Sequence, residues 1–213
     1  MERYLVLIAD IESSKEIKEG RREALQDKLQ EELNHLNQTD HAPVSPYTIT
    51  LGDEFQAVFE EAGALPVHLF RILAVSHPVR IRFSLGVGSI ATPVNTEQAI
   101  GMDGPAFHEA RNGMDTLKES GFLFHLNVEK EESAILKLIN ASLQLLSHEI
   151  KTWKKNRLAI LYLLKEGYDY KKIADRLDIS TPAFYKNKEA GALEVISTLI
   201  DSITALVNQQ ITA

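Results

Sequence analysis

Acidic residues stand at the ends of two apolar segments that are far apart in the sequence. Asp10 follows the apolar run 4–9, and Asp53 and Glu54 follow Gly52 in the stretch TITLGDEF. Two carboxylates at adjacent strand ends repel each other, and a bound divalent cation with oxygen ligands, Mg²⁺ or Mn²⁺, is the usual resolution. An alternative stays open, in which Asp10 caps a turn and the other two carboxylates form a solvated hairpin tip.

The loop that follows Asp10, IESSK at 11–15, is suited to binding phosphate groups. It offers backbone N–H groups and the hydroxyls of Ser13 and Ser14. Because Mg²⁺ keeps several waters and takes phosphate oxygens as ligands, it fits a site with few protein ligands. These residues indicate a nucleoside triphosphate or another nucleotide as the ligand.

The segments between these residues predict an α+β fold in which the two acidic sites meet. The predicted elements are a strand at 4–9, a helix at 21–36, a hairpin of strands at 45–50 and 55–59, a helix at 62–76, a strand at 79–90, a helix at 105–119 and a strand at 122–128. The order β-α-β-β-α-β with a further α-β unit is the ferredoxin-like pattern with an extension. In that pattern the third strand lies beside the first and runs antiparallel to it, so Asp53 is expected next to Asp10.

The composition restricts the class of protein. The 213 residues are 44% hydrophobic and 25% charged, which is typical of a soluble globular protein, and cysteine is absent, which excludes disulfides and thiolate metal sites. The apolar run near the start is only six residues long, too short for a signal peptide or a membrane span. We therefore expect a cytoplasmic protein with no membrane partner.

The net charge of −7 is unevenly distributed along the chain. Residues 1–150 carry 13 Lys and Arg against 23 Asp and Glu, whereas residues 151–190 carry 10 against 5. The last 23 residues carry only Glu194 and Asp201. A basic block in an otherwise acidic protein suits contact with a polyanion such as DNA.

The basic block has the pattern of a helix-turn-helix. A helix predicted at 158–165 ends before Gly167, a second helix covers 169–177, and a third begins at Ser180 or Thr181 with Pro182 in its first turn. Small side chains early in the third helix and basic ones later suit a DNA groove. The residues expected to contact DNA are Lys171, Lys172, Thr181, Ala183, Phe184, Lys186, Asn187 and Lys188. A helical bundle that dimerises or binds protein is the alternative.

These patterns divide the chain into three parts. Residues 1–129 form the predicted α+β domain, residues 130–153 a linking helix, and residues 154–213 an all-α helix-turn-helix domain. The last helix, predicted at 193–207, has an apolar stripe with only two charges and is expected to pack against the chain or to pair with a second copy.

Several motifs resemble those of nucleotidyl cyclases. LIADIESS resembles the first strand and metal loop of the class III enzymes, LGDEFQAVF resembles their Gly-Asp hairpin and the GGDEF motif of diguanylate cyclases, and VRIRFSLGVGSI with GPAFHEAR resembles the strand and helix that follow. This resemblance covers about residues 3–128. Over its full length the chain resembles the SatD family, whose members combine such a region with a C-terminal helix-turn-helix.

The resemblance implies a palm-like domain with bound metal ions and assigns roles to individual residues. The implied metal ligands are Asp10, the Ile11 carbonyl and Asp53. The implied nucleotide-binding residues are Glu12, Ser13, Ser14, Lys15 and Gly52. Glu54 and Arg111 are the candidates for a catalytic role. Since the class III active site forms between two subunits, the resemblance also implies a homodimer.

Two positions depart from the cyclase pattern and affect the expected function. The Lys that selects the base is Ile49 here, and the transition-state Asn is Phe107 if Arg111 is the family's helix Arg. These departures favour binding over turnover. The expected function is a regulator that couples a metal- and nucleotide-binding region to a DNA-binding helix-turn-helix. An active nucleotidyl cyclase using ATP or GTP, and a protein-interaction module without a ligand, are the alternatives.

Overall fold

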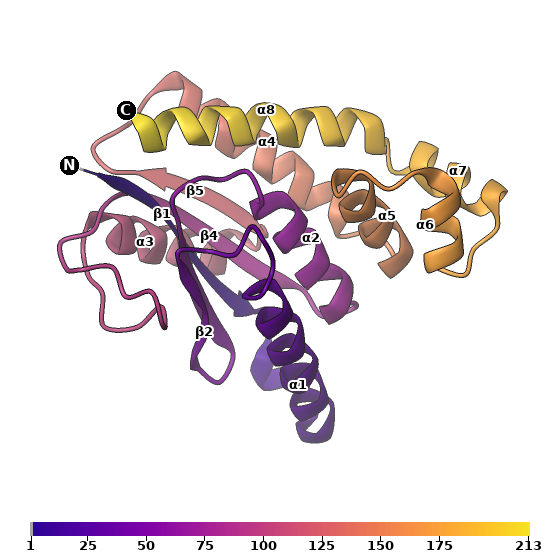
Figure 1. Cartoon of the computed structure of the whole chain (residues 1–213), viewed down its shortest axis with the longest axis horizontal. Coiled ribbons are helices and arrows are strands. Elements are labelled where there is room, and N and C mark those ends of the chain that lie inside the picture. Colours follow the sequence, from indigo (N-terminus) through magenta and orange to yellow (C-terminus); the bar gives the residue numbers. More distant parts are fainter. Residues whose placement is uncertain (1) are drawn as a thin grey trace.

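A five-stranded sheet forms the centre of the protein (Figure 1). Its strands are β1 (Arg3–Ile11), β2 (Ser45–Leu51), β3 (Glu54–Phe59), β4 (Ile81–Ser89) and β5 (Phe124–Val128). Their order is β2-β3-β1-β4-β5, and neighbours are antiparallel except β4 and β5, which are parallel. The computed structural model describes residues 2–213, apart from the side chains of Lys15 and Leu51. The predicted α+β class is confirmed.

Helices cover both faces of this sheet (Figure 1). They are the short 3₁₀ helix η1 (Ser14–Glu16) and the α-helices α1 (Glu19–Leu36), α2 (Leu65–Ser76), α3 (Pro105–Ser120), α4 (Ala134–Ile150), α5 (Lys155–Lys165), α6 (Tyr170–Arg176), α7 (Thr181–Ala190) and α8 (Leu193–Thr212). Helix α3 covers one face, and α1, α2, α4 and α8 cover the other. Each predicted helix is present, with ends that differ from the predicted ones by a few residues.

Strand β1 determines which face each of its side chains reaches. Leu5 and Leu7 belong to the core shared with α1 and α2, whereas Val6 and Ile8 belong to the core under α3. Successive side chains of a strand point to opposite faces, so Asp10 continues the second set and points to the α3 face. The central strand is apolar on both faces because helices cover both.

The first strand is longer than the sequence predicts. We expected Asp10 to follow the end of a strand at 4–9, but β1 continues to Ile11, and Asp10 pairs with Glu54 on one side and Arg82 on the other. Both neighbouring strands extend this far, so they supply backbone hydrogen bonds for two more residues of β1. Asp10 therefore lies inside the sheet and not beyond its edge.

Small residues let α3 lie close to β4. A Cβ atom added to Gly86 would overlap with the Ala106 carbonyl oxygen and the Ala110 nitrogen, both in the backbone of α3. The hydroxyl of Ser84 donates a hydrogen bond of 2.6 Å to the Ala110 carbonyl. This contact fixes the height of α3 above the strand, and with it the position of every α3 side chain that faces the sheet.

The C-terminal helices are attached to the sheet layer through α2 and α5. Arg71 of α2 donates hydrogen bonds to Glu32 of α1 at 2.6 Å and to Glu166 at 3.1 Å, just after α5. Its guanidinium also lies 5.3 Å from the ring centre of Tyr162. The buried residues of α5 continue the core of the sheet, so the predicted linker between 130 and 153 does not separate two hydrophobic cores.

Helix α8 runs back over the sheet layer, so that the two chain ends lie on the same side of the molecule (Figure 1). Arg3 donates a hydrogen bond of 2.7 Å to the Gln210 carbonyl, and Asn208 accepts one of 2.7 Å from the Ala62 N–H. Helix α8 thus packs against the chain itself. No single helix of residues 2–213 is long and apolar enough to span a membrane; α7 and α8 satisfy the length and composition requirement only as a pair bent by 57°.

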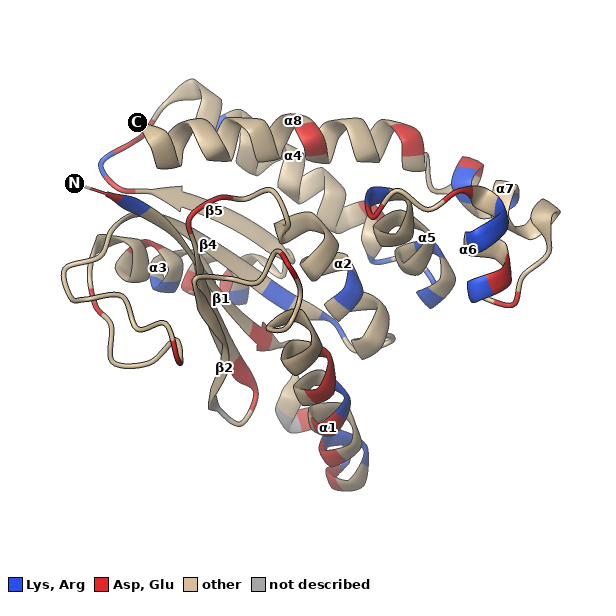
Figure 2. Cartoon of the chain, viewed as in Figure 1, with Lys and Arg blue, Asp and Glu red and all other residues tan. Residues whose placement is uncertain are grey.

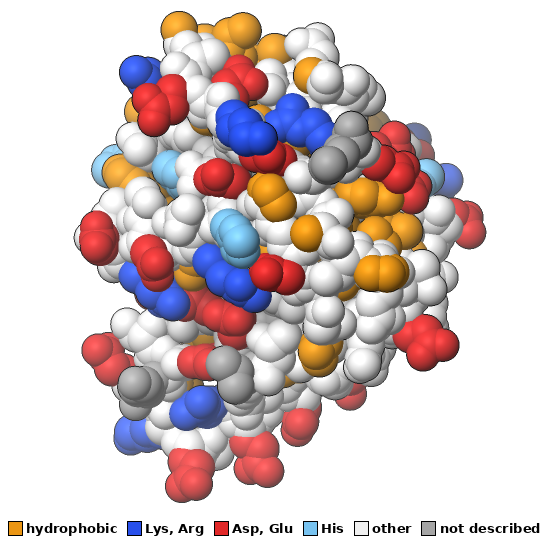
Figure 3. Space-filling view, turned by 90° about the vertical axis from the view of Figure 1, so that its left-hand side faces the viewer, with side chains coloured by type: hydrophobic (Ala, Val, Ile, Leu, Met, Phe, Trp, Pro, Cys, Tyr) orange, Lys and Arg blue, Asp and Glu red, His pale blue; other side chains and the backbone are white. Residues whose placement is uncertain are grey.

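Acidic and basic side chains are interspersed over the surface. Lys and Arg residues occur along α5, α6 and α7 with acidic residues between them (Figure 2), and both signs also mix on the end that carries both termini (Figure 3). Residues 151–190 carry 10 Lys and Arg against 5 Asp and Glu, so basic residues predominate in this part of the fold.

The close contact between α3 and β4 predicts a strong effect of one added methyl group. Gly86→Ala should lower the free energy of unfolding by about 3 kcal/mol or more, because the methyl group meets backbone atoms that cannot rotate away. Gly20→Ala is the matched control, since nothing lies within 4 Å of the added Cβ in the first turn of α1. It should be neutral or stabilising by up to about 1 kcal/mol. Urea denaturation measures both, and equal effects would contradict the close contact.

Candidate functional site

Three charged residues form a row across the sheet on the α3 face. Asp10 of β1 lies directly opposite Glu54 of β3 and directly opposite Arg82 of β4. Side chains of directly opposed residues point to the same face and approach closely. The strand register alone therefore brings two carboxylates and one guanidinium together.

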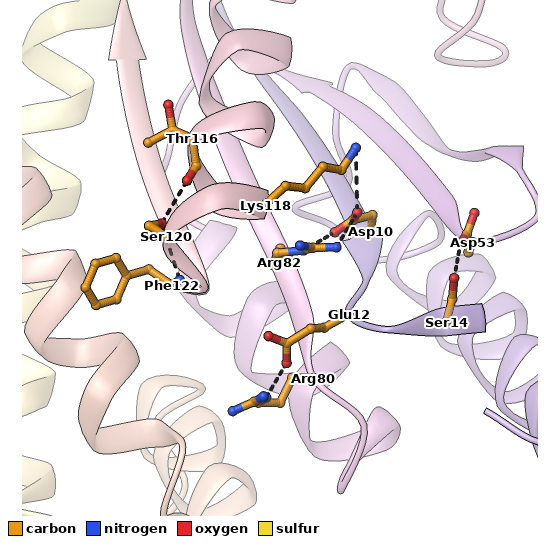
Figure 4. Close-up of polar contacts among 10 residues, drawn as sticks. All are labelled: Asp10, Glu12, Ser14, Asp53, Arg80, Arg82, Thr116, Lys118, Ser120 and Phe122. Carbon is orange, nitrogen blue, oxygen red and sulfur yellow. Dashed lines mark hydrogen bonds and ion pairs between the residues drawn. The ribbon is translucent and has the colours of Figure 1, made fainter. Parts of the chain in front are cut away.

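Asp10 is paired with basic side chains. Its two carboxylate oxygens accept hydrogen bonds from Nε and Nη2 of Arg82 at 2.8 and 2.9 Å, and Nζ of Lys118, from α3, lies 3.9 Å away (Figure 4). These partners come from other elements of the fold, 72 residues along the chain for Arg82, and no Lys or Arg near Asp10 in the sequence indicates them. Asp10 is only 8% exposed, so the bidentate partner compensates for the loss of hydration.

The hairpin turn between β2 and β3 lies beside the end of β1. The Ile11 N–H donates a hydrogen bond of 3.1 Å to the Asp53 carbonyl. Gly52 has a φ of 58°, a left-handed conformation that favours glycine, and its carbonyl accepts a hydrogen bond from the Gln26 side chain of α1. The Asp53 carboxylate accepts a hydrogen bond from the Ser14 hydroxyl, on the other side of Asp10 from Arg82 and Lys118 (Figure 4).

These residues line an open pocket of about 440 Å³. Its lining residues are Asp10, Ile11, Ser13, Ser14, Glu16, Asp53, Glu54, Arg82 and Lys118. Four carboxylates and two basic side chains give this described lining a formal net charge of −2. The structure thus brings together Asp10, Ile11 and Asp53, the three implied metal ligands, with both serine hydroxyls of the loop.

Other expected nucleotide-binding residues are placed differently. Glu12 is ion-paired with Arg80 and does not line the pocket, and Gly52 contributes the turn and no part of the lining. Ser13 is exposed with a left-handed backbone at φ 52°, immediately before η1. The side chain of Lys15 lies outside the described part of the structure.

The oxygen donors suit Mg²⁺ or Mn²⁺ in kind, but in this conformation they do not converge on one point. Among the described residues, no group of three or more His, Cys, Asp or Glu side chains is placed to hold a metal ion. Both oxygens of Asp10 are occupied by Arg82, and Asp53 is bonded to Ser14. A cation at Asp10 would have to share this carboxylate with Arg82 or displace it.

Of the remaining residues that the cyclase resemblance singles out, most do not line this pocket. Arg111 is exposed on α3, two helical turns before Lys118, and does not line the pocket. Phe107 is fully buried in the core under α3, and Ile49 packs against the core on the other face. Glu54 does line the pocket, where its carboxylate accepts a hydrogen bond of 3.3 Å from Thr50.

Sequence reasoning missed Arg82 and Lys118, although both had detectable signals. The stretch 79–84 alternates apolar and polar side chains, so an antiparallel neighbour of β1 could place Arg82 on the face of Asp10. Lys118 follows Met114 by four residues on α3, and Met114 faces the sheet. Neither signal specifies which residue of β1 is opposite, because strand register is set by the whole sheet.

The second candidate surface lies on α6 and α7. Asp169 caps α6 by accepting hydrogen bonds from the N–H groups of Lys172 and Lys171, which lower the pKa of its carboxyl. Ser180 caps α7 through the Ala183 N–H, and four residues connect the two helices. The side chains of Lys171, Lys172, Thr181 and Lys186 are exposed.

Four of the residues expected to contact DNA are buried, half-buried or paired within the chain. The expectation that Phe184 is presented to a groove is wrong, because its side chain is 2% exposed and packs 6.2 Å from the ring of Tyr170. Ala183 and Asn187 are half-buried, and the amide of Asn187 donates to the Ala183 carbonyl. Lys188 is ion-paired with Glu194 at 2.5 Å. Tyr185, which sequence reasoning passed over, is exposed instead.

Comparison with known protein families gives one match, and it covers most of the chain. The model of the SatD family matches residues 4–204. The chain belongs to the SatD family. No curated protein and no solved structure matches this SatD-family chain. The match includes the sheet, the pocket at Asp10 and the surface of α6 and α7, so both candidate sites lie within the region that defines a SatD protein.

The buried pair predicts unequal roles for two neighbouring arginines of this SatD-family protein. Arg82→Gln should lower the free energy of unfolding by about 3 kcal/mol, because the Asp10 carboxylate stays buried with only a distant Lys118. Arg80→Gln is the matched control. Its side chain is 44% exposed and pairs with Glu12, so the loss should be below about 1 kcal/mol.

Chemical denaturation at neutral pH measures both variants. The double variant Asp10→Asn with Arg82→Gln should recover part of the stability, since neither side chain then carries an unpaired charge. An equal loss in the two single variants would show that the Asp10 pair does not contribute more than a surface pair.

Proposed function

We propose that this protein is a regulator whose helices α6 and α7 form a DNA-binding helix-turn-helix. The observation that supports this most is a group of exposed lysines on the two helices, Lys171 and Lys172 on α6 and Lys186 on α7. Among the described residues these three lysines make no ion pair. Cations that are not neutralised by the protein are available to phosphates.

Two of the five acidic residues in 151–190 have defined partners, whereas Asp175, Asp178 and Glu189 are exposed on or between the same two helices and partly offset the positive charge. Glu166 is paired with Arg71 of α2, and Asp169 is the cap of α6. Phe184 and Ile173 are buried and belong to the same hydrophobic core as the sheet, which anchors α6 and α7 to the rest of the fold, and Thr181 in the first turn of α7 is exposed. Thr181 and Tyr185 supply a hydroxyl and an aromatic ring on the same exposed helix.

This proposal predicts salt-dependent DNA binding that depends on the three lysines. In fluorescence anisotropy with a labelled DNA duplex of random sequence, binding should weaken steeply as salt rises. Replacing Lys171, Lys172 and Lys186 by Gln should reduce the slope of log K against log salt by up to about 3 and the affinity by more than about ten-fold. Lys28→Gln, an exposed lysine of α1, is the matched control and should leave both unchanged.

The result is decisive in either direction. Binding that the triple variant retains in full would contradict the assignment of this surface, and absence of any salt-sensitive binding to DNA would contradict the DNA-binding function itself.

A second activity, binding of a nucleotide with Mg²⁺ or Mn²⁺ in the Asp10 pocket, has separate support. The described lining of this pocket has a formal net charge of −2, which favours a cation, and two serine hydroxyls and two basic side chains stand where phosphates could bind. Asp10, Asp53 and the Ile11 carbonyl would hold the metal ion, which would neutralise phosphate charge. Arg82 would lose its partner when Asp10 binds the cation and could then pair with a phosphate.

Binding is better supported than turnover in this pocket. The positions that carry base selection and transition-state stabilisation in the resembled cyclases are Ile49, which packs against one hydrophobic core, and Phe107, which lies inside the other. Phe107 is fully buried, and Ile49 is a partly buried apolar side chain without a polar group to select a base. An active cyclase using ATP or GTP is therefore the less supported reading, and release of pyrophosphate from either nucleotide would establish it.

The binding proposal predicts a ligand-dependent melting temperature. A ligand that binds only the folded state raises stability, so ATP or GTP with Mn²⁺ should raise the Tm by a few degrees at saturating concentration. Asp53→Asn should abolish that shift, since it removes a proposed ligand and leaves the Asp10 pair intact. Asp115→Asn, on the exposed side of α3, is the matched control. An unchanged Tm with every nucleotide and metal would favour an interaction module without a ligand.

A further inference from the structure

Helix α4 carries an unpartnered apolar stripe on its outer surface. Leu138 is 65% exposed and Leu145 69% exposed, and Ile135 at the edge of the stripe is also exposed. Helix α4 lies beside α8 at the top of Figure 1, and hydrophobic side chains reach the surface along the upper rim of Figure 3. Two leucines this exposed one above the other on a helix indicate a surface that another chain covers.

The inner side of α4 is fixed, so this stripe has a defined position. Ile139, Leu143 and Leu146 are buried in the main core. The side chain of Asn140 donates to the Leu126 carbonyl at 2.8 Å and accepts from the Leu126 N–H at 2.9 Å, which holds α4 against the outer edge of β5. The helix therefore cannot rotate to bury its leucines within its own chain.

The spacing of the exposed residues is that of a helix-pairing seam. Spacings of four and three residues alternate along the exposed line Ala134, Leu138, Ala141, Leu145 and His148. This is the pattern by which one helix packs along another. Ala141 in the middle allows the two backbones to approach closely. The neighbouring Ser142 hydroxyl already donates to the Leu138 carbonyl, so burying it leaves no unsatisfied donor.

The charges at the two ends of α4 favour antiparallel pairing with α4 of a second copy of the chain. Glu131 and Glu132 precede the helix, where Lys130 is paired with Glu129, and Lys151, Lys154 and Lys155 follow it, with Glu149 in its last turn, so the C-terminal end is the more basic one. If two copies of α4 pair in antiparallel fashion, the acidic end of each lies beside the basic end of the other, and the helix dipoles oppose. A parallel pair would place like charges together.

We propose that the protein forms a homodimer through α4, with a two-fold axis beside Ala141 and Leu138 of each chain packed on Leu145 of the other. This arrangement is isologous, because each contact occurs twice. It involves no residue of the pocket at Asp10 and does not depend on DNA binding. A helix of 17 residues is about 26 Å long, so the pair is smaller than a standard interface and the dimer is weak and concentration-dependent.

Sedimentation velocity over a range from low micromolar to submillimolar protein measures the association. The wild-type chain should shift from monomer to dimer, and Leu138→Glu should remain a monomer over the whole range, because a buried carboxylate would be unpaired at the seam. Val195→Glu, at an equally exposed position of α8, is the matched control and should dimerise normally. Equal Tm values would show that both variants are folded. A wild-type protein that stays monomeric throughout would overturn the proposal.

Single cysteines test the orientation, since the chain has no cysteine of its own. Under mild oxidation, Ala141→Cys should form a disulfide-linked dimer, because the two copies of position 141 meet near the axis. Ala134→Cys should not, because in an antiparallel pair its two copies lie about 20 Å apart. Cross-linking of Ala134→Cys in preference to Ala141→Cys would overturn the antiparallel arrangement.

Discussion

A carboxylate inside a sheet needs a partner for its charge, and the arrangement of the candidate site follows from this constraint. Asp10 is buried in the central strand, and only the residue directly opposite on β4 can give it a bidentate partner. Lys118 approaches the same carboxylate because α3 lies close to the strand, which in turn requires a glycine at position 86. The pocket is thus built from strand register and from the height of one helix.

The same constraint suggests how a ligand would change the protein. A cation that binds the Asp10 carboxylate would free the Arg82 guanidinium. The paired and the cation-bound states would therefore differ in whether Arg82 is available to a ligand in the pocket. Ile11, the next residue of β1, points to the opposite face and is buried in the core that continues through α2 to α5. The end of β1 and helix α5 therefore share one core, and α5 contacts α6 and α7, the proposed DNA-binding helices. Coupling between the two sites is a hypothesis that this packing motivates.

The helices, the strands and the order of neighbouring strands were predictable from the sequence, whereas the ion pairs between them were not. Apolar runs, helical leucine spacing and cap residues predicted each strand and α-helix but not η1, and the β-α-β-β-α-β order predicted that the hairpin at Gly52 lies beside Asp10. Register was not predictable, because it depends on all five strands at once, so Arg82 was not recognised as the partner of Asp10. The burial of Phe184 was missed for a related reason. A helix of ten residues offers too few turns to distinguish its inner face when Phe184 and Tyr185 are adjacent.

The measurement that tests the regulatory account most directly is the affinity for DNA with and without a saturating nucleotide and Mn²⁺, at constant ionic strength. Coupling between the sites predicts that the ligand changes the affinity by at least about five-fold, a coupling free energy of about 1 kcal/mol. The Asp53→Asn variant should bind DNA as the wild type does but show no response to nucleotide. Identical affinities in the presence and absence of a ligand that is shown to be bound would contradict the account.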